Sequence, residues 1–570
     1  MAVGDILKKS FKASIILCII ATWLLGNAFI TNTKWVKGEK MLVTSQMLAT
    51  YTILMVPAIY ASEKLKNKLK FQRILESILI LISLAIIWKA STTASYSEIR
   101  LHQAFMAASA GILYYLTWNA DITGKKTAAV AVAALAIAAF SGDIREALTK
   151  ENNGFDDCKV YDKEPTIRRS IYVIGLDGAT WTTLKPALES GMLPNIKKLI
   201  EDGVSAEFES IEYEGEYMSP VIWTTIFTGE NPEDHGIQGY TITALDESLI
   251  GFYSTPYLST MRKKPAIWNM LSEKGVNSVV SGFWATWPAE EVEGAIISDH
   301  LVRWNNGWHH PIGAQQTNRI TYPEELVYEL EDKTLNPKTL ERYRIEGFFN
   351  DSWQKDDLED ILMMSYALDQ TYIDSGLYAR EKYNPELTLI YLEGFDVVQH
   401  YFFGHAMPWK FKQDIEFQEK YKDTINLYLK YCDDLVGTIL SKNSVEDTII
   451  IISDHGMKAK ENPDKRHKNL GWYADHAMEG VVIAYGPDIR KGETINGMTI
   501  LDFTPTILYY MGMPVSEGMD GKIEYELFTD EFNNENQCSK VKEYRLPEKG
   551  DYSGESEDLM RKLQTVGYIE

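Results

Sequence analysis

Cysteine and basic residues are both scarce in this chain of 570 residues. Its four cysteines, Cys18, Cys158, Cys432 and Cys538, include no C-x-x-C pair, so their spacing predicts neither a disulfide framework nor a cysteine-based zinc site. Lysine and arginine number 57 against 80 aspartates and glutamates, which leaves a net charge of −23. A nucleic-acid-binding protein needs a basic face. We therefore predict no nucleic-acid partner.

Long apolar runs are concentrated in the first 150 residues. They span 13–30, 41–61, 74–88, 105–118 and 127–140. A bilayer needs ~20 apolar residues per helix, and the longer runs approach that length. The first run could belong to a signal peptide instead, but no clean small-x-small cleavage site follows it. We predict an all-α transmembrane domain of about five helices at 1–145.

Basic residues in the short loops predict the orientation of this domain. They cluster at 8–12, 64–73 and 125–126, which five spans place on one side, whereas 34–40 and Arg100 fall on the other. The more basic side of a membrane protein is usually cytoplasmic. The sequence therefore predicts an integral membrane protein whose C-terminal part is extracytoplasmic.

The stretch TIIIISDHGM at 448–457 carries the strongest α/β signal. Its run of isoleucines suits a buried strand of a parallel sheet and is too short for a typical helix. Asp454 and His455 follow at the strand end where open α/β sheets bind ligands, and together they offer oxygen and nitrogen to a divalent metal. Taken alone, the triplet Asp-His-Gly is more typical of a capped turn.

Two more predicted strands end in a carboxylate. The apolar run at 171–176 is followed directly by Asp177. Taken alone, an aspartate at this place is more typical of a helix-capping turn. The run TLIYLEGF is followed by Asp396 and, four residues later, by His400. This D-x-x-x-H spacing places both side chains on one face of a helix, where they can hold one ion. His476, just before a predicted strand at 480–485, would be the third member of the set.

Ser219 stands just before Pro220, at the predicted start of a helix. Proline is favoured as the first helical residue, and a helix N-terminus favours an anion. A serine hydroxyl becomes a good nucleophile only when a base or metal activates it. The alternative is that Ser219 serves only as an N-cap.

In chain order these motifs are LDG, S-P-x-x-W-T-T-x-x-T-G-x-N-P-x-x-H-G-I, D-x-x-x-H, SDHGM and H-x-x-x-G-V-x-I-A-Y-G-P. The series resembles the alkaline phosphatase superfamily, and most of all its type I phosphodiesterase and nucleotide pyrophosphatase branch. The similarity runs from about residue 171 to residue 528. It implies an α/β, alkaline phosphatase-like sandwich with a central, mostly parallel sheet flanked by helices.

The resemblance also implies two divalent metal ions, usually zinc, with manganese as an alternative. The residues it assigns to them are Asp177, Asp454, His455 and Ser219 for one ion, and Asp396, His400 and His476 for the other. Oxygen and nitrogen ligands of this kind suit zinc. Ser219 would attack phosphorus and form a phosphoryl-serine, which water then hydrolyses.

Residues 221–223 beside Ser219 are apolar, which favours a diester with an organic substituent over a monoester. We therefore predict a membrane-anchored hydrolase of phosphodiester or pyrophosphate bonds, acting on a lipid- or nucleotide-linked substrate. The S-P-V sequence at 219–221 does not match the C/S-x-P-x-R motif of sulfatases, so sulfatase activity is not expected.

The architecture is also similar to that of the phosphoethanolamine and glycerol-phosphate transferases of bacterial envelopes. In that alternative the phosphoryl group passes to a lipid or glycan hydroxyl instead of water. A phosphomonoesterase is a further alternative. A non-catalytic membrane receptor is the least favoured, because the complete set of site residues is present. The sequence does not indicate which oligomeric state the protein adopts.

The domain boundaries follow from these assignments. We predict a polar linker at 146–168, the catalytic domain at 169–530 and a C-terminal tail at 531–570. An insertion around 301–384 lies between the motif groups and is predicted to form a cap that selects the substrate.

Overall fold

The computed structural model describes residues 155, 157–160, 170–246, 251–302, 319–350, 355–442, 444, 446–465 and 471–547. The predicted membrane domain, most of the linker, part of the predicted cap at 303–318 and the end of the tail lie outside the described residues. Among the residues that are described, no helix is long and apolar enough to cross a membrane. The membrane domain, and the orientation that follows from it, stay predictions.

The chain divides into two units, one of residues 1–151 with 241–255 and the other of residues 152–240 with 256–570. In the first unit the structure describes β4 (Thr241–Asp246) and all but the last residue of β5 (Gly251–Pro256), and these two strands form a two-stranded sheet. The other described helices and strands belong to the second unit.

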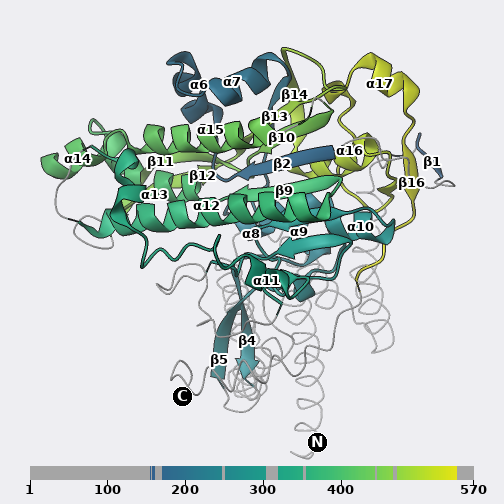
Figure 1. The fold of residues 1–570 in the computed structure, drawn as a ribbon, viewed down its shortest axis with the longest axis horizontal. Helices are drawn as coiled ribbons and strands as arrows, with labels where there is room; N and C mark the ends of the chain where they lie inside the picture. Colours follow the sequence, from purple (N-terminus) through teal and green to yellow (C-terminus); the bar gives the residue numbers. More distant parts are fainter. Residues whose placement is uncertain are drawn as a thin grey trace, which may run out of the picture. The chain divides into compact units, whose positions relative to one another are not determined.

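A sheet of nine strands forms the centre of the second unit (Figure 1). In spatial order the strands are β14 (Glu493–Thr499), β3 (Val204–Glu209), β13 (Glu479–Tyr485), β10 (Asp447–Ile452), β2 (Ser170–Leu176), β9 (Leu387–Leu392), β6 (Ser278–Ser281), β7 (Gly294–Ile297) and β8 (Thr321–Tyr322). Most neighbours run parallel; β13 is antiparallel to β10 and β3, and β8 is antiparallel to β7. The predicted α/β fold with a mostly parallel sheet is confirmed.

The central strands are apolar along most of their length because helices cover both faces of the sheet. In register, Ile451 of β10 lies beside Ile174 of β2, which in turn lies beside Ile390 of β9. Successive side chains of a strand point to opposite faces. Accordingly Ile174 belongs to one hydrophobic core and Val173 to the other. The buried strands predicted from the apolar runs are confirmed.

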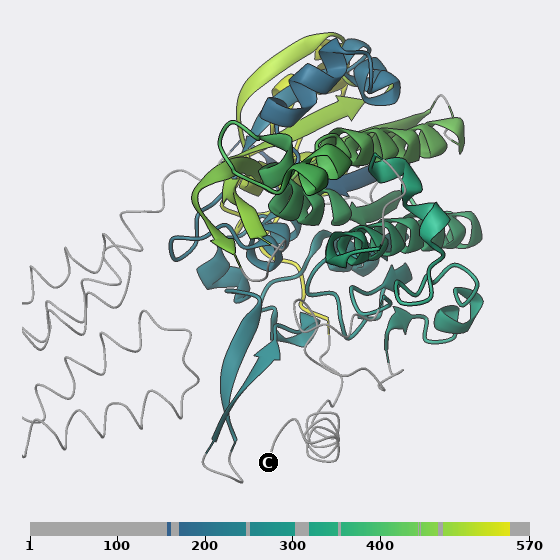
Figure 2. The ribbon, with the colours of Figure 1, turned by 90° about the vertical axis from the view of Figure 1, so that its left-hand side faces the viewer.

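The three longest described helices lie over one face of the sheet. They are α12 (Asp357–Tyr383), α13 (Gly394–Ala406) and α15 (Thr424–Lys442), and α13 packs against both of the others. Figures 1 and 2 both show α12 and α15 as long, roughly parallel helices on the same side. The opposite core contains residues of α8 (Ser219–Thr228), α10 (Ile267–Glu273) and α16 (Phe503–Tyr510).

The remaining described elements are shorter or peripheral. The helices are α6 (Trp181–Glu189), α7 (Pro194–Glu201), α9 (Pro232–His235), α11 (Leu326–Glu329), α14 (Ile415–Tyr421) and α17 (Asp530–Glu535). The strands are β1 (Lys159–Val160), β11 (Gly456–Lys465), β12 (Gly471–Ala477), β15 (Val515–Ser516) and β16 (Ser539–Val541). The 3-10 turns are η1 (Ser259–Met261), η2 (Arg342–Arg344), η3 (Glu346–Phe348), η4 (Ile500–Asp502) and η5 (Tyr525–Leu527).

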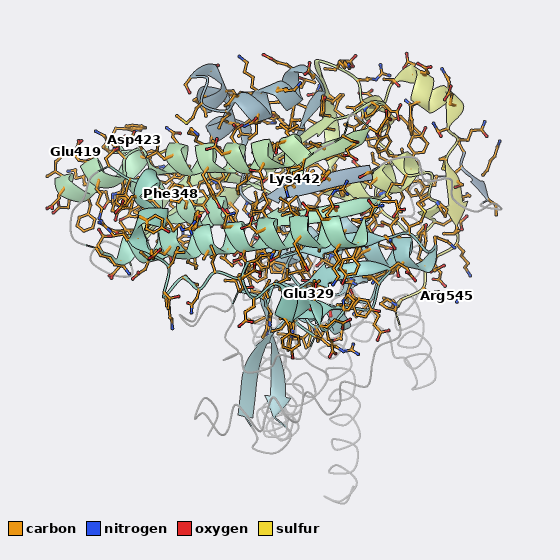
Figure 3. All side chains as sticks on the ribbon, viewed as in Figure 1. Glu329, Phe348, Glu419, Asp423, Lys442 and Arg545 are labelled. Carbon is orange, nitrogen blue, oxygen red and sulfur yellow. A yellow bond between two sulfur atoms is a disulfide. The ribbon has the colours of Figure 1, made fainter. Side chains whose placement is uncertain are left out.

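The described part of the predicted cap contributes to the core. Helix α12 packs on β9 and β6. Phe348 of η3, labelled in Figure 3, lies against Tyr428 of α15, and the ring centroids are 5.0 Å apart. These contacts make 346–348 and α12 part of the helical layer over the sheet. A substrate-selecting role for the rest of the segment stays a prediction.

Cys158 and Cys538 form a disulfide across 380 residues of chain. Next to it β1 pairs in parallel with β16, with Lys159 opposite Ser539. The spacing of the cysteines, which predicted no disulfide framework, did not indicate this single bond. The two partners meet only after the unit has folded, a relationship that local spacing does not encode.

Candidate metal centre

The predicted site residues gather at one edge of the sheet, beyond the carboxyl ends of its three central strands. Asp177 follows β2, Asp454 follows β10 after one intervening residue, and Asp396 lies in the first turn of α13 after β9. The three strands are parallel neighbours, so their carboxyl ends lie side by side at one edge of the sheet, where open α/β sheets bind ligands.

Asp177, Asp454 and His455 form the first group, with one ligand atom from each lying within 4.8 Å of the others. His455 Nε2 is 3.2 Å from Asp177 Oδ1 and 3.4 Å from Asp454 Oδ2. All three side chains are buried. Asp177 Oδ1, both Asp454 carboxylate oxygens and His455 Nε2 have no hydrogen-bond partner among the described residues. Buried polar atoms are seldom left unpaired, so this group fits a cation.

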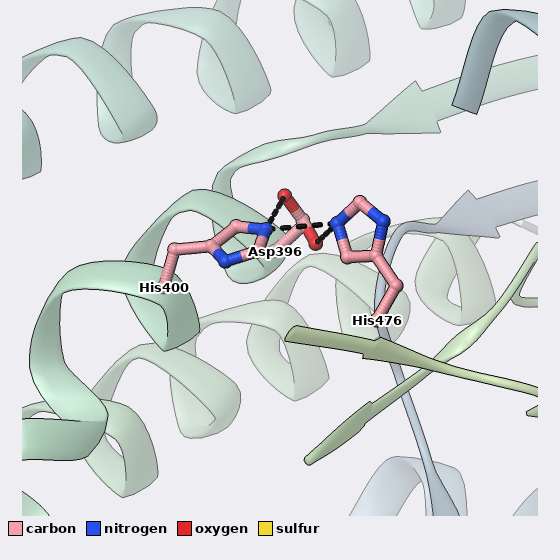
Figure 4. Close-up of side chains that lie close together, drawn as sticks. All are labelled: Asp396, His400 and His476. Carbon is pink, nitrogen blue, oxygen red and sulfur yellow. Dashed lines mark hydrogen bonds and ion pairs between the residues drawn. The ribbon is translucent and has the colours of Figure 1, made fainter. Parts of the chain in front are cut away.

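Asp396, His400 and His476 form the second group (Figure 4). His400 Nε2 lies 3.4 Å from Asp396 Oδ2, and His476 Nε2 lies 3.4 Å from Asp396 Oδ1. Helix α13 puts Asp396 and His400 on one face, as their spacing predicted, while His476 comes from β12. Asp396 Oδ1 is also 3.9 Å from His455 Nε2, so the two groups adjoin.

The far ring nitrogen of each histidine faces a backbone carbonyl. The Nδ1 to oxygen pairs are His400 with Ala474 (2.9 Å), His455 with Gly456 (3.0 Å) and His476 with Tyr217 (2.5 Å). A carbonyl only accepts, so Nδ1 carries the proton and Nε2 keeps a lone pair. Metal-binding histidines are oriented in this way. The lone pairs of His400 Nε2 and His476 Nε2 then face each other across 2.8 Å, which a shared cation would stabilise.

The electrostatics of both groups also favour a cation. Burial, and next the neighbouring Asp177, raises the pKa of Asp454 well above its ordinary value. Burial works against the ionisation of Asp396, yet His400 and His476 hold the pKa of Asp396 well below its ordinary value. Several buried charges of one sign cannot ionise together at such distances without compensation. A bound cation would supply it.

Ser219 is the first residue of α8, and the chain on either side of it reaches both groups. Tyr217, two residues earlier, accepts from His476 Nδ1, and Trp223, one turn later, donates to Asp177 Oδ2 at 3.2 Å. The structure therefore places this helix start next to both candidate metal groups.

At the start of α8, where an anion site was predicted, two backbone amides already have partners. The amides of Val221 and Ile222 donate to the Met218 carbonyl at 2.9 and 3.0 Å, and Pro220 has no N–H. The apolar residues 221–223 are also fully buried in the core. They do not line a substrate pocket, so the preference for a diester drawn from them is not supported.

Sequence reasoning missed Tyr240, whose phenol is hydrogen-bonded to Ser219. Burial raises the pKa of Tyr240 well above its ordinary value, and the nearby carboxylates of Asp396 and Asp177 add to the rise. The phenol therefore keeps its proton beside the Ser219 hydroxyl. Its ring meets Trp284 edge to face, with centroids 5.5 Å apart. No local motif marks this residue.

A third acidic group, Glu230, Asp234 and Asp520, lies elsewhere. Lys264 Nζ is 2.9 Å from Glu230 Oε1, and Asp520 Oδ2 accepts from the Asn231 amide. These contacts already compensate negative charge in this group, so the group gives no indication of a bound ligand.

The model of the family described as type I phosphodiesterase / nucleotide pyrophosphatase matches residues 171–497, more than half of the chain. The chain belongs to this family. It is therefore a phosphodiesterase/nucleotide pyrophosphatase-family hydrolase. The match spans Asp177 at its start and His476 near its end, so both candidate metal groups fall inside the family region.

Solved structures show more distant likenesses. Phosphonoacetate hydrolase from Sinorhizobium meliloti 1021, in complex with phosphonoformate, is 16% identical, with a TM-score of 0.32, over 53% of this chain and 60% of that chain. Murine ectonucleotide pyrophosphatase/phosphodiesterase 5, as an inactive variant with AMP, is 14% identical, with a TM-score of 0.36, over 63% of this chain and 100% of that chain. The comparison with curated proteins gives no match.

Proposed function

We propose that this family member is a membrane-anchored, two-metal phosphohydrolase that cleaves phosphodiester or pyrophosphate bonds through a phosphoryl-serine intermediate. The main support is the pair of adjoining carboxylate and imidazole groups. Among the described residues, four buried ligand atoms of the first group and Asp396 Oδ1 of the second have no hydrogen-bond partner. Asp177, Asp454 and His455, with Ser219, would hold one ion. Asp396, His400 and His476 would hold the other. Zinc suits these ligands, with manganese as the alternative.

Bound divalent ions would supply Lewis-acid stabilisation of negative charge on the phosphoryl group and on the reacting hydroxyl. The Ser219 oxygen forms the new bond to phosphorus as its hydroxyl proton passes to solvent, and the leaving oxygen departs with the bonding electron pair and takes up a proton from water. Water then attacks the phosphoryl-serine, which releases the phosphoryl group as phosphate and restores the Ser219 hydroxyl. Tyr240, which keeps its proton, holds the Ser219 oxygen through its hydrogen bond. The paired carbonyls keep all three histidines in the tautomer with Nε2 free.

The proposed substrate class rests on family membership. A phosphodiester or pyrophosphate is the bond that the family description names. We extend this to a lipid- or nucleotide-linked phosphate ester, because a membrane-anchored enzyme has ready access to lipid substrates.

We place the catalytic unit outside the cytoplasm. The distribution of basic residues in the first 150 residues supports this location. The disulfide between Cys158 and Cys538 supports it independently, because disulfides persist in oxidising compartments and are rare in the cytosol.

The test is hydrolysis by the full-length chain of a chromogenic phosphodiester and of the matching monoester, with zinc and with chelator. Diester cleavage should disappear in chelator and return with zinc. Ser219→Ala should lower kcat by about 10³-fold or more, since the nucleophile is lost. Ser205→Ala is the matched control. Its serine is 6% exposed against 4% for Ser219, and it lies on β3 outside both metal groups.

The outcomes separate the alternatives. Faster cleavage of the monoester would change the proposed substrate class but not the nucleophile. Phosphorylated Ser219 that persists in water and discharges only to a lipid or glycan hydroxyl would favour the transferase. A chain that binds no zinc or manganese and cleaves neither ester would reject the proposal.

A further inference from the structure

The two carboxylate oxygens of Asp177 have different surroundings. Oδ2 accepts from Trp223 Nε1 at 3.2 Å and from the Tyr391 hydroxyl. Oδ1 has no hydrogen-bond partner among the described residues and lies 3.2 Å from His455 Nε2. Two donors on one oxygen fix the plane of the carboxylate and direct the other oxygen at the first metal group.

The direction of the Tyr391 hydrogen bond is itself fixed. The hydroxyl accepts from Trp284 Nε1 at 2.9 Å, and an indole N–H can only donate. The phenol proton is therefore available for Asp177. Hydrogen bonds in such a series polarise one another. The Tyr391 ring is held between Phe283 and Trp223, with centroids 5.0 and 5.4 Å away, so it cannot swing aside.

The turn that carries Trp284 is fixed from its other side by Asp299. Asp299 accepts from the amides of Ala285 and Trp287 at 3.1 and 3.0 Å, and from the Thr286 hydroxyl at 3.3 Å. Ala285 adopts a positive φ of 56°, a conformation that a non-glycine residue keeps only where its surroundings hold it. A buried, locked turn thus supports the series Trp284, Tyr391, Asp177.

We propose that Tyr391 is a positioning residue for the first metal group, acting through Asp177 and oriented by Trp284. This inference rests on the proposed two-metal function. Tyr391 is not assigned a contact with the substrate or the ion. Without its hydroxyl, Asp177 Oδ2 would keep, among the described residues, the one hydrogen bond from Trp223. The carboxylate would then gain freedom to turn its free oxygen away from His455.

The test is a zinc titration of the full-length chain in competition with a chromophoric chelator. The wild type should bind two zinc ions. In Tyr391→Phe, which keeps the ring, one site should weaken by about 10–100-fold, the usual effect of losing a partner of a metal ligand. The other site should be unchanged, and saturating zinc should restore hydrolysis. Trp284→Phe should weaken the same site to a smaller extent.

The matched control is Tyr421→Phe. Tyr421 is as deeply buried as Tyr391, and its hydroxyl also donates to a carboxylate, that of Asp356, at 2.8 Å. Tyr421 and Asp356 both lie outside the two metal groups, so the affinities of both zinc sites should stay at the wild-type values in Tyr421→Phe.

Unchanged zinc binding in Tyr391→Phe, or an equal loss in Tyr421→Phe, would overturn the positioning role alone. A wild-type chain without zinc sites would overturn the proposed function as well. If Tyr391→Phe does not fold, Trp284→Phe decides: a weakened zinc site supports the role, and two unchanged sites overturn it.

Discussion

The imidazoles of His455 and His476 stack on each other, with ring centroids 3.8 Å apart and planes inclined by 23°. One ring belongs to the first metal group and the other to the second. His455 directly precedes β11, and His476 lies on β12, where it is the partner of Met457 in an antiparallel pair. The spacing between the two candidate sites is therefore set by this strand pair and not by a loop.

This arrangement predicts that His476→Ala loses one metal ion selectively. His476 contributes Nε2 to the second group, but it meets the first group only through its ring face. Zinc measured by elemental analysis after dialysis should fall from about two per chain to about one.

The control for this prediction is His405→Gln, which alters a buried histidine of α13 outside both groups and should keep both ions. Loss of both ions from His476→Ala would show that the two sites do not bind separately. Retention of both would show that His476 is not a ligand.

Gly394, the first residue of α13, is predicted to tolerate no side chain. A Cβ there would lie 2.0 Å from the Tyr428 hydroxyl and 2.6 Å from Asp369 Oδ2. The Gly394 amide also donates to Asp369 at 2.9 Å, so the helix cannot shift without breaking that bond. Gly394→Ala should destabilise the unit by about 1–3 kcal/mol, the usual range for overpacking. It should also weaken zinc binding through Asp396, which lies two residues later in the same helical turn.

Thermal unfolding checks this prediction, with Gly347→Ala as the control. A Cβ on Gly347 would meet no atom of the described chain within 4 Å. That variant should keep the wild-type unfolding midpoint. Equal midpoints for the two variants would contradict the packing argument.

The parts of the site that the sequence predicted are those with a local signal. Asp177, Asp396 and Asp454 each follow an apolar run, and a strand end positions the next side chain whatever the rest of the fold does. Tyr240 and Tyr391 carry no such signal. They reach Ser219 and Asp177 only through tertiary packing, which brings together segments far apart in the chain.

The same reasoning explains two further features that the sequence did not indicate. Cys158 and Cys538 are 380 residues apart, and their pairing depends on where the two ends of the unit meet. The predicted cap at 301–384 includes α12 because its boundaries were drawn only from the position of this segment between the motif groups. Its burial against β9 and β6 could not be inferred from that position.

Asp369 is predicted to make stability depend on pH. Burial raises the pKa of Asp369 to about 7, although the Gly394 amide and the Tyr428 hydroxyl favour the charged form. The ordinary value is 3.8, so between pH 4 and 7 the folded chain binds a proton that the unfolded chain has lost. The contribution of Asp369 to the free energy of unfolding therefore decreases as pH rises through that window, by at most about 1.4 kcal/mol per pH unit.

The measurement is the unfolding midpoint from pH 4 to 8 in chelator, for wild type and Asp369→Asn. The unfolding midpoint of the wild type should exceed that of Asp369→Asn by most at low pH, and this difference should decrease towards pH 7. Asp332→Asn, at a side chain that is 76% exposed, should follow the wild type. A difference between wild type and Asp369→Asn that does not change with pH would contradict the prediction.

The disulfide predicts both a stability effect and a chemical state. It joins residues 380 positions apart, and a disulfide typically contributes about 2–4 kcal/mol to the free energy of unfolding. Cys538→Ser should lower the unfolding midpoint, and a reductant should lower that of the wild type but not that of the variant. Cys432→Ser is the control, because Cys432 is a buried free thiol in α15.

Non-reducing peptide mapping of chain isolated from its own cells should recover Cys158 linked to Cys538. Recovery of both as free thiols would argue against the extracytoplasmic location, because an oxidising compartment would keep this bond closed.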